Sequence, residues 1–250
     1  MTQNAEPRGL RLLIIACGAL AHEIMALRRA NGWDRLDVSC LPADLHNRPE
    51  KIPAAVRALI HASRGRYESI FVAYGDCGTG GLLDKVLREE GVERIPGAHC
   101  YEFFATSPKF SALAEAEPGT FYLTDFLLRH FDRLVIRGLG LDRHPELHSM
   151  YFGNYRKLVY LAQAPKPGSE EQARAIAARM GLQFEIRQTG YGSLGTTLAD
   201  AVTRAADARR SDAPRSDAPG SDTSRSGSPR GDAEPGDYAP REDEVVAWVR

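Results

Sequence analysis

Apolar runs alternate with helical patterns along most of this chain, and the alternation is the strongest constraint on its fold. The pairs are LRLLIIAC with ALAHEIMALRRANG, LDVSCL with IPAAVRALIHASRG, SIFVAYG with GLLDKVLREEG, and RKLVYLAQ with SEEQARAIAARMG, before a last run QFEIRQTG. Strands that alternate with helices form βαβ units, whose strands run parallel. We therefore expect an α/β protein with a mainly parallel sheet flanked by helices in Rossmann-like layers.

The character of the chain changes near residue 206. From there on it is rich in Ser, Asp, Pro, Gly and Arg, and large apolar side chains are nearly absent until the last few residues. Such a segment cannot bury enough apolar surface to offset the entropy that it would lose on ordering. We expect one α/β domain over residues 1–205, which carries the site, and a low-complexity, disordered tail over residues 206–250.

The charges of the chain are balanced, because 32 Lys and Arg face 33 Asp and Glu. This balance argues against a nucleic-acid partner and against an anionic membrane surface. No apolar run approaches the roughly 18 residues of a membrane span, and the N-terminal run is not typical of a secretory signal. We expect a cytoplasmic protein.

Three cysteines follow predicted strands: Cys17 comes after LLIIA, Cys77 after SIFVAYGD and Cys100 after RIPGAH. Ligands of open parallel sheets bind outside the carboxyl ends of the strands, and cysteines of cytoplasmic proteins serve as thiols or metal ligands more often than as disulfides. We expect these three to form a metal site at one sheet edge. Cys40 has apolar neighbours in LDVSCL and is expected in the core.

The donor types favour zinc, which accepts thiolate, imidazole and carboxylate ligands and keeps an open position when it is catalytic. Three thiolates could also hold an iron–sulfur cluster. Asp76 and Glu102 are candidates for a general base or for groups that orient the ligands, and the spacing does not separate these roles. His46, on the loop after the second predicted strand, and His99, next to Cys100, are further partners, but His99 and Cys100 would point to opposite faces of an extended segment, which favours Cys100.

The stretch YGDCGTGG, residues 74–81, sets Cys77 among glycines. Gly78, Gly80 and Gly81 can adopt positive φ and let a bound group approach the backbone, so we expect them to contact substrate. The stretch is not a Walker motif, because no Lys-Ser or Lys-Thr follows the glycines.

The segment GLGLDRHPELHSMYFGNY, residues 138–155, is a second dense polar cluster. The residues expected to contact substrate there are Arg143, His144, Tyr151 and Tyr155. His144 and His148 are four residues apart and would share a helix face as a metal pair, but Pro145 indicates a loop at this point.

Several motifs together resemble the family known as "domain of unknown function 1638": ACGALAHEI, YGDCGTGG, HCYEFF, YLTDFL and the segment at 138–155. The resemblance covers roughly residues 10–200, and the low-complexity tail departs from it. It implies a bacterial or archaeal cytoplasmic α/β protein that is associated with methylamine and corrinoid methyl-transfer gene sets.

These observations lead us to expect a metal-dependent enzyme, a hydrolase, lyase or methyltransferase, acting on a small polar substrate. The alternatives are a zinc- or corrinoid-linked methyltransferase with a corrinoid protein as partner, a three-cysteine iron–sulfur protein, and a metal- or ligand-binding protein without enzymatic activity.

Overall fold

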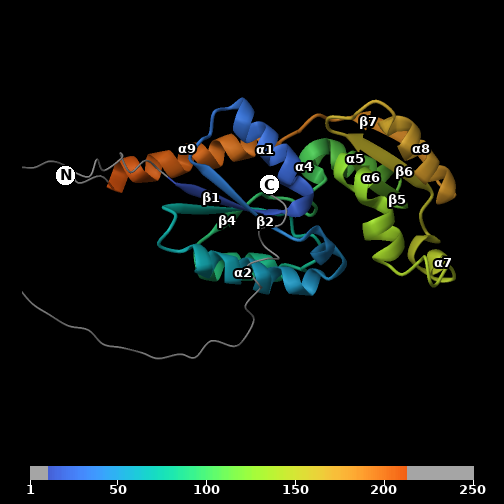
Figure 1. The fold of residues 1–250 in the computed structure, drawn as a ribbon, viewed down its shortest axis with the longest axis horizontal. Helices are drawn as coiled ribbons and strands as arrows, with labels where there is room; N and C mark the ends of the chain where they lie inside the picture. Colours follow the sequence, from blue (N-terminus) through green and yellow to red (C-terminus); the bar gives the residue numbers. More distant parts are fainter. Residues whose placement is uncertain (1–10, 213–250) are drawn as a thin grey trace, which may run out of the picture.

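The structure, a computed structural model, describes residues 11–212, which form two parallel sheets in two lobes. The lobes lie side by side along the long axis of the molecule (Figure 1). The predicted α/β class is therefore confirmed, but the strands do not share one sheet. The first sheet ends at a two-residue edge strand, after which the chain leaves that lobe and starts a new sheet.

The first sheet has the strand order β2-β1-β3-β4, and all its pairs are parallel. Its strands are β1 (Leu12–Cys17), β2 (Leu36–Leu41), β3 (Ser69–Ala73) and β4 (Glu93–Arg94). Every residue of β1 is buried, because this strand lies between two neighbours and is covered on both faces. The carboxyl ends of β1 and β2 are level, with Cys17 opposite Leu41.

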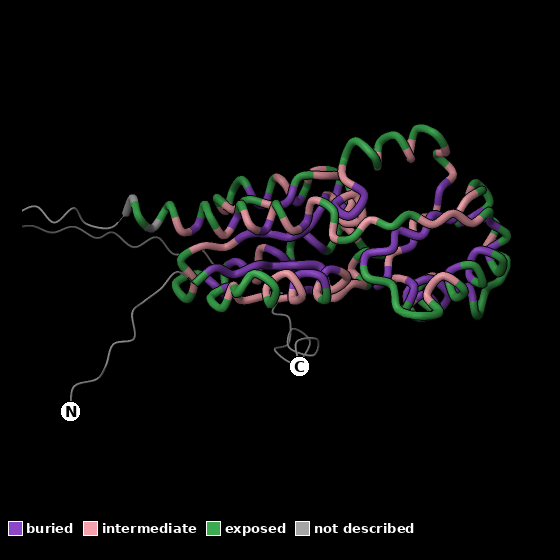
Figure 2. The backbone as a smooth tube through the Cα atoms, turned by 90° about the horizontal axis from the view of Figure 1, so that it is seen from above, coloured by how far each residue is buried: buried purple, intermediate pink, exposed green. Residues whose placement is uncertain are grey.

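Helices cover both faces of this sheet. Figure 1 shows α1 (Ala21–Ala30) beside α9 (Leu194–Asp212) on one face and α2 (Ile52–Ser63) on the other, where α2 packs against α3 (Leu82–Glu90). Short 3-10 turns follow the strands in the connections: η1 (Gly18–Leu20), η2 (Ala43–Asn47) and η3 (Pro49–Lys51). Buried strands run through the interior of each lobe, and the outer faces of the helices are exposed (Figure 2).

The second sheet has the parallel order β5-β6-β7, which makes β5 an edge strand. Its strands are β5 (Thr120–Thr124), β6 (Lys157–Ala162) and β7 (Gln183–Gln188). Helix α4 (Glu102–Ala105) buries Phe103 and Phe104 in the core of the first lobe. The helices that follow it before α9 are α5 (Ser107–Ala116), α6 (Asp125–Phe131), the π-helix η4 (Asp132–Arg137), α7 (Leu147–Phe152) and α8 (Ser169–Arg179).

A buried carboxylate joins the ends of β5 and β6. Asp125 Oδ1 accepts hydrogen bonds from the Tyr160 hydroxyl at 2.6 Å and from Gln163 N at 3.4 Å, and Oδ2 accepts one from Ala164 N at 2.7 Å. Buried carboxylates need such partners, because an unsatisfied charge in the interior is costly.

After β7 the chain returns to the first lobe through α9. Leu194, Leu198, Ala201 and Ala205 of this helix are buried in the core of the first lobe. The helix extends to Asp212 and so covers the first residues of the tail that was expected from residue 206. The rest of that segment, and residues 1–10, lie outside the described residues. Within residues 11–212, no helix combines the length and the apolar character needed to cross a bilayer.

The turn before α9 docks closely on α4. Ser193 N donates to Phe103 O at 2.8 Å, and a Cβ added at Gly192, where φ is +51°, would lie 2.2 Å from the backbone oxygens of Phe103 and Phe104. Gly190 also has a positive φ of +58°, but a Cβ there would meet nothing within 4 Å. Of these two glycines, Gly192 alone combines a positive φ with a close approach to another backbone.

These two glycines form a matched pair for a stability test. Gly190→Ala should cost about 1 kcal/mol from left-handed strain alone, or roughly 2–4 °C in melting temperature. Gly192→Ala should lower the melting temperature at least twice as much, since the methyl group meets backbone oxygens that cannot move aside. Equal shifts in calorimetry would show that the contact of this turn with α4 does not hold α9 in place.

Candidate thiolate site

Three of the four cysteines meet at the carboxyl edge of the first sheet. Cys17 ends β1, and Cys77 and Cys100 lie in the loops after β3 and β4. The sulfurs of Cys77 and Cys100 are 3.2 Å apart, and Cys100 also hydrogen-bonds to Cys17. All are free thiols, and Cys17 and Cys77 are buried. The structure thus brings together the three cysteines that the sequence selected, while Cys40 lies in the core as expected.

Hydrogen bonds between the loop after β3 and the loop after β4 position Cys77. Asp76 N donates to Gly97 O at 3.0 Å, and Cys77 N donates to Ala98 O at 2.8 Å. Cys77 itself has a φ of +49°, which non-glycine residues seldom adopt. Gly75 is needed here because an added Cβ would lie 2.9 Å from the carbonyl carbon of His99. The backbone of one loop therefore passes directly over the other.

The three glycines predicted to contact substrate shape this loop. Gly78, Gly80 and Gly81 have φ values of +84°, +61° and +82°. A Cβ at Gly80 or Gly81 would meet nothing within 4 Å, and at Gly78 it would only touch the Pro49 ring at 3.5 Å. What the described residues require of these glycines is a left-handed backbone.

The two predicted catalytic carboxylates bind loop backbone. Asp76 Oδ1 accepts from Thr79 Oγ1 at 2.6 Å and from Gly81 N at 2.9 Å, and Oδ2 accepts from Gly80 N at 3.1 Å. Burial by itself would raise the pKa of Asp76, but these hydrogen bonds outweigh it, so the pKa is lowered. Glu102 Oε2 accepts from Ala98 N at 2.8 Å. Both carboxylates thus hold the two loops that carry Cys77 and Cys100.

The three thiols differ in their tendency to ionise. Hydrogen bonding from Cys100 lowers the pKa of Cys77 to about 5, with a further contribution from His46. The same donor lowers the pKa of Cys17. The pKa of Cys100 is raised well above its usual value, because its proton is shared with two sulfur acceptors. Burial raises the pKa of Cys40 to about 12. The cluster therefore favours a protonated Cys100 between two thiolates.

His46, in η2, belongs to this cluster, although the sequence did not select it as a site residue. Its hydrogen bond to Cys77 raises the pKa of the imidazole. The sequence position of His46 could have predicted this, because η2 follows β2 and the parallel strands of a sheet end at the same edge. Nearby, Nδ1 of His99 is buried and has no hydrogen-bond partner among the described residues.

His99 and Cys100 do not lie on an extended strand. The chain turns here, with Glu102 N donating to His99 O and Phe103 N to Cys100 O, and α4 follows. His99 stacks on Tyr101, with ring centroids 4.9 Å apart. Burial lowers the pKa of His99, in contrast to the raised pKa of His46.

A cavity of about 350 Å³ opens beside the cysteines and is lined from both lobes. Cys17, Cys100 and His46 belong to its lining, whereas Cys77 does not and lies against Cys100. The cavity also follows the edge strand β5, which contributes Thr120, Phe121, Tyr122 and Thr124. The aromatic side chains of the lining are Tyr101, Phe104, Phe121, Tyr122, Phe126, Tyr151, Phe152 and Tyr155.

The predicted contacts in residues 138–155 divide into two groups. Tyr151 and Tyr155 line the cavity. Arg143 and His144 are not among its lining residues, because they lie on the exposed loop before α7, beside Asp142 and Glu146. The alternative of a metal pair formed by His144 and His148 gains no support, since His148 packs against Phe152.

Within the described residues, no group of three or more His, Cys, Asp or Glu side chains already has the arrangement of a metal site. One sulfur pair of the cysteine cluster can be compared with a zinc site by its distance. Two sulfurs bound to one tetrahedral zinc at about 2.3 Å lie roughly 3.8 Å apart. Cys77 and Cys100, now 3.2 Å apart, would have to separate by about half an ångström, which side-chain rotation can supply.

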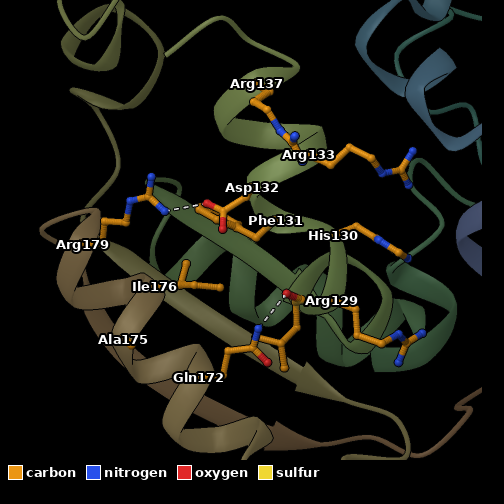
Figure 3. A pocket seen from close by; sticks show the side chains of 11 residues that line it. Arg129, His130, Phe131, Asp132, Arg133, Arg137, Gln172, Ala175, Ile176 and Arg179 are labelled. Carbon is orange, nitrogen blue, oxygen red and sulfur yellow. Dashed lines mark hydrogen bonds and ion pairs between the residues drawn. The ribbon is translucent and has the colours of Figure 1, made fainter. Parts of the chain in front are cut away.

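A second hollow, of about 400 Å³, lies between α6, η4 and α8 and is rich in basic side chains. Figure 3 shows Arg129 and Arg133 extending away from Arg179, which pairs with Asp132 at 2.6 Å. Its basic groups therefore do not converge on one point, and the hollow does not compete with the cysteine cluster as the candidate site.

Comparison with known proteins identifies a family but no activity. The family model described as "Protein of unknown function (DUF1638)" matches residues 40–198, which include Cys77, Cys100 and most of the cavity lining. No curated protein matches the chain.

The ionisation of the cluster can be measured through the ultraviolet absorbance of thiolates. Chelator-treated protein should show thiolate at pH 7 that disappears as the pH falls through about 5, the pKa of Cys77. Cys100→Ala removes the main hydrogen bond that lowers this pKa, so the midpoint should move upward. Cys40→Ala is the control and should leave it unchanged. A midpoint that is the same in all three proteins would contradict the proposed hydrogen bonding.

Proposed function

Because this chain belongs to the DUF1638 family, whose function is unknown, its activity has to be argued from its own residues, and we propose that it is a metal-dependent enzyme. One observation carries the proposal: three thiols, one at the end of β1 and two in the loops after β3 and β4, gather beside an imidazole and next to a cavity of about 350 Å³. Buried cysteines with only a packing role have no reason to converge in this way.

The donor set suits zinc. Three protein ligands with a fourth position open to substrate are typical of catalytic zinc sites, and Cys17, Cys77 and Cys100 would supply those three ligands. Thiolates bind the metal: hydrogen bonding with Cys100 lowers the pKa of Cys17 and Cys77, whereas the pKa of Cys100 is raised, so metal binding would have to displace the Cys100 proton. When bound, such a metal acts as a Lewis acid that polarises a substrate or activates water.

The residues around the cysteines have separate proposed roles. His46 lines the cavity, and its hydrogen bond with Cys77, which raises the pKa of the imidazole, suits it to orient this thiolate. Asp76 and Glu102 are positioning residues, because their carboxylates hold the cysteine loops. Tyr151 and Tyr155 contact the substrate from the second lobe. The free cysteines suit a reducing compartment, which supports a cytoplasmic location.

A metal-free thiol enzyme is the second candidate. Cys17 lines the cavity and has a lowered pKa, so it could attack an electrophilic substrate directly. Stoichiometric modification of Cys17 by a substrate-like electrophile, in protein that contains no metal, would favour this alternative.

Three further assignments stay open to experiment. A methyltransferase would transfer a methyl group to a thiol when supplied with a corrinoid protein. An iron–sulfur protein would be coloured and oxygen-sensitive. A binding protein without activity would take up metal or ligand and turn nothing over.

Elemental analysis of anaerobically purified protein tests the main proposal. We expect about one equivalent of zinc per chain, as in other sites with three protein ligands. Cys17→Ser, Cys77→Ser and Cys100→Ser should each lose most of the metal, whereas Cys40→Ser, in the core, should keep it. Wild-type protein without metal, or retention of metal by all three variants, would overturn the assignment.

A further inference from the structure

The wall of the cavity is dominated by rings. Eight aromatic side chains line it, and they come from both lobes. They pack against one another as well: Phe121 meets Phe152 and Tyr155 edge-on, and Tyr101 stacks on Tyr122 with centroids 5.2 Å apart. Most of the remaining lining is aliphatic, including Leu127, Leu134 and Leu139. Surfaces of this kind favour the flat, apolar face of a ligand.

No Asp, Glu, Lys or Arg is among the described residues that line the cavity. Part of the neutral polar lining is already engaged: Asn47 Nδ2 donates to Leu134 O at 3.2 Å, Thr120 Oγ1 donates to Glu117 O at 2.6 Å, and Thr124 Oγ1 accepts from Leu127 N at 3.2 Å. A carboxylate or phosphate ligand would therefore lose its hydration without gaining an arginine or lysine partner, which is unfavourable.

The cysteines offer an anion no favourable charge either. Three thiolates around a divalent metal would leave a net negative charge beside the cavity. His46, the imidazole of the lining, is already hydrogen-bonded to Cys77. An uncharged ligand avoids both problems, because it meets neither an unpaired charge nor repulsion from the sulfurs.

The volume sets the scale of the ligand. A dry apolar cavity of about 150 Å³ accommodates benzene. The cavity here, at about 350 Å³, is roughly twice as large. It therefore suits a two-ring system, or one ring that carries a short chain.

We propose that the cavity selects an uncharged, mainly apolar ligand with an aromatic or similarly flat body, whose reactive group lies beside Cys17 and Cys100. This inference rests on the proposed function for the identity of the site, and it replaces the small polar substrate expected from the sequence. The body of the ligand lies against the rings of Phe121, Phe152 and Tyr155.

A pair of probes with the same shape and different charge tests the proposal on the full-length protein. Naphthamide is neutral and naphthoate is anionic, so their affinities, measured by titration calorimetry, isolate the effect of charge. Naphthamide should bind more tightly, by about tenfold or more, since the anion finds no countercharge. Equal affinities, tighter binding of naphthoate, or binding of neither probe would overturn the proposal.

A charge placed in the cavity should change this preference. Leu139 lines the cavity, so Leu139→Lys should reduce or reverse the tenfold preference for naphthamide. Leu82 is 52% exposed and does not line the cavity, so Leu82→Lys is the matched control and should keep the wild-type preference. If both variants kept the wild-type preference, the probe would be bound elsewhere and the proposal would fail.

Metal content, measured on the same samples, separates this inference from the proposed function. Protein that prefers naphthamide but contains no metal would uphold the ligand class and defeat the metal-dependent enzyme. Protein that contains metal but shows no preference for naphthamide would support the metal site and defeat the proposed ligand class.

Discussion

The parallel backbone pairing of β1 with β2 and β3 is the constraint on which the candidate site depends. This pairing sets the three strand ends level, so the chain that leaves each strand emerges at one edge of the sheet. Cys17, His46 and Cys77 come from these three exits. Because β1 is buried on both faces, a slip of one residue would exchange the side chains that pack against the two helical layers of the first lobe. The core that stabilises the first lobe therefore also assembles the cluster.

The cluster needs a second support, because strand ends alone place loops only approximately. Hydrogen bonds supply this support. The backbone N–H groups of Asp76 and Cys77 donate to the carbonyl oxygens of residues 97 and 98, which joins the two cysteine loops. The carboxylates of Asp76 and Glu102 each accept hydrogen bonds within their own loop. The left-handed conformation of Cys77 is tolerated because these bonds fix the backbone on both sides. Strain of this kind, held by surrounding structure, is frequent at functional sites.

The two-lobed arrangement gives the cluster its cavity. The first lobe supplies sulfur and imidazole, and the second supplies most of the aromatic wall. Helix α9 starts after the last strand of the second sheet and packs into the core of the first lobe, so the chain crosses between the lobes twice. The docking of Ser193 and Gly192 on α4 keeps this return path close to Cys100. The relative position of reactive groups and aromatic wall thus depends on contacts far apart in sequence.

The sequence by itself determined the α/β class, the strands β1, β2, β3, β6 and β7 with the helices α1, α2, α3 and α8, and the three cysteines that meet, because apolar periodicity and strand-end position are local properties of the chain. It did not determine that the strands divide into two sheets, since a βαβ pattern does not specify which strand pairs with which. Nor did it assign Asp76 and Glu102 to loop support or place His46 beside Cys77, because hydrogen-bond partners are set by contacts between loops. The neutral aromatic cavity was also decided by tertiary structure alone: its lining comes from residues 17–155 and both lobes, and the polar residues Arg143 and His144, close in sequence to Tyr151, lie outside it.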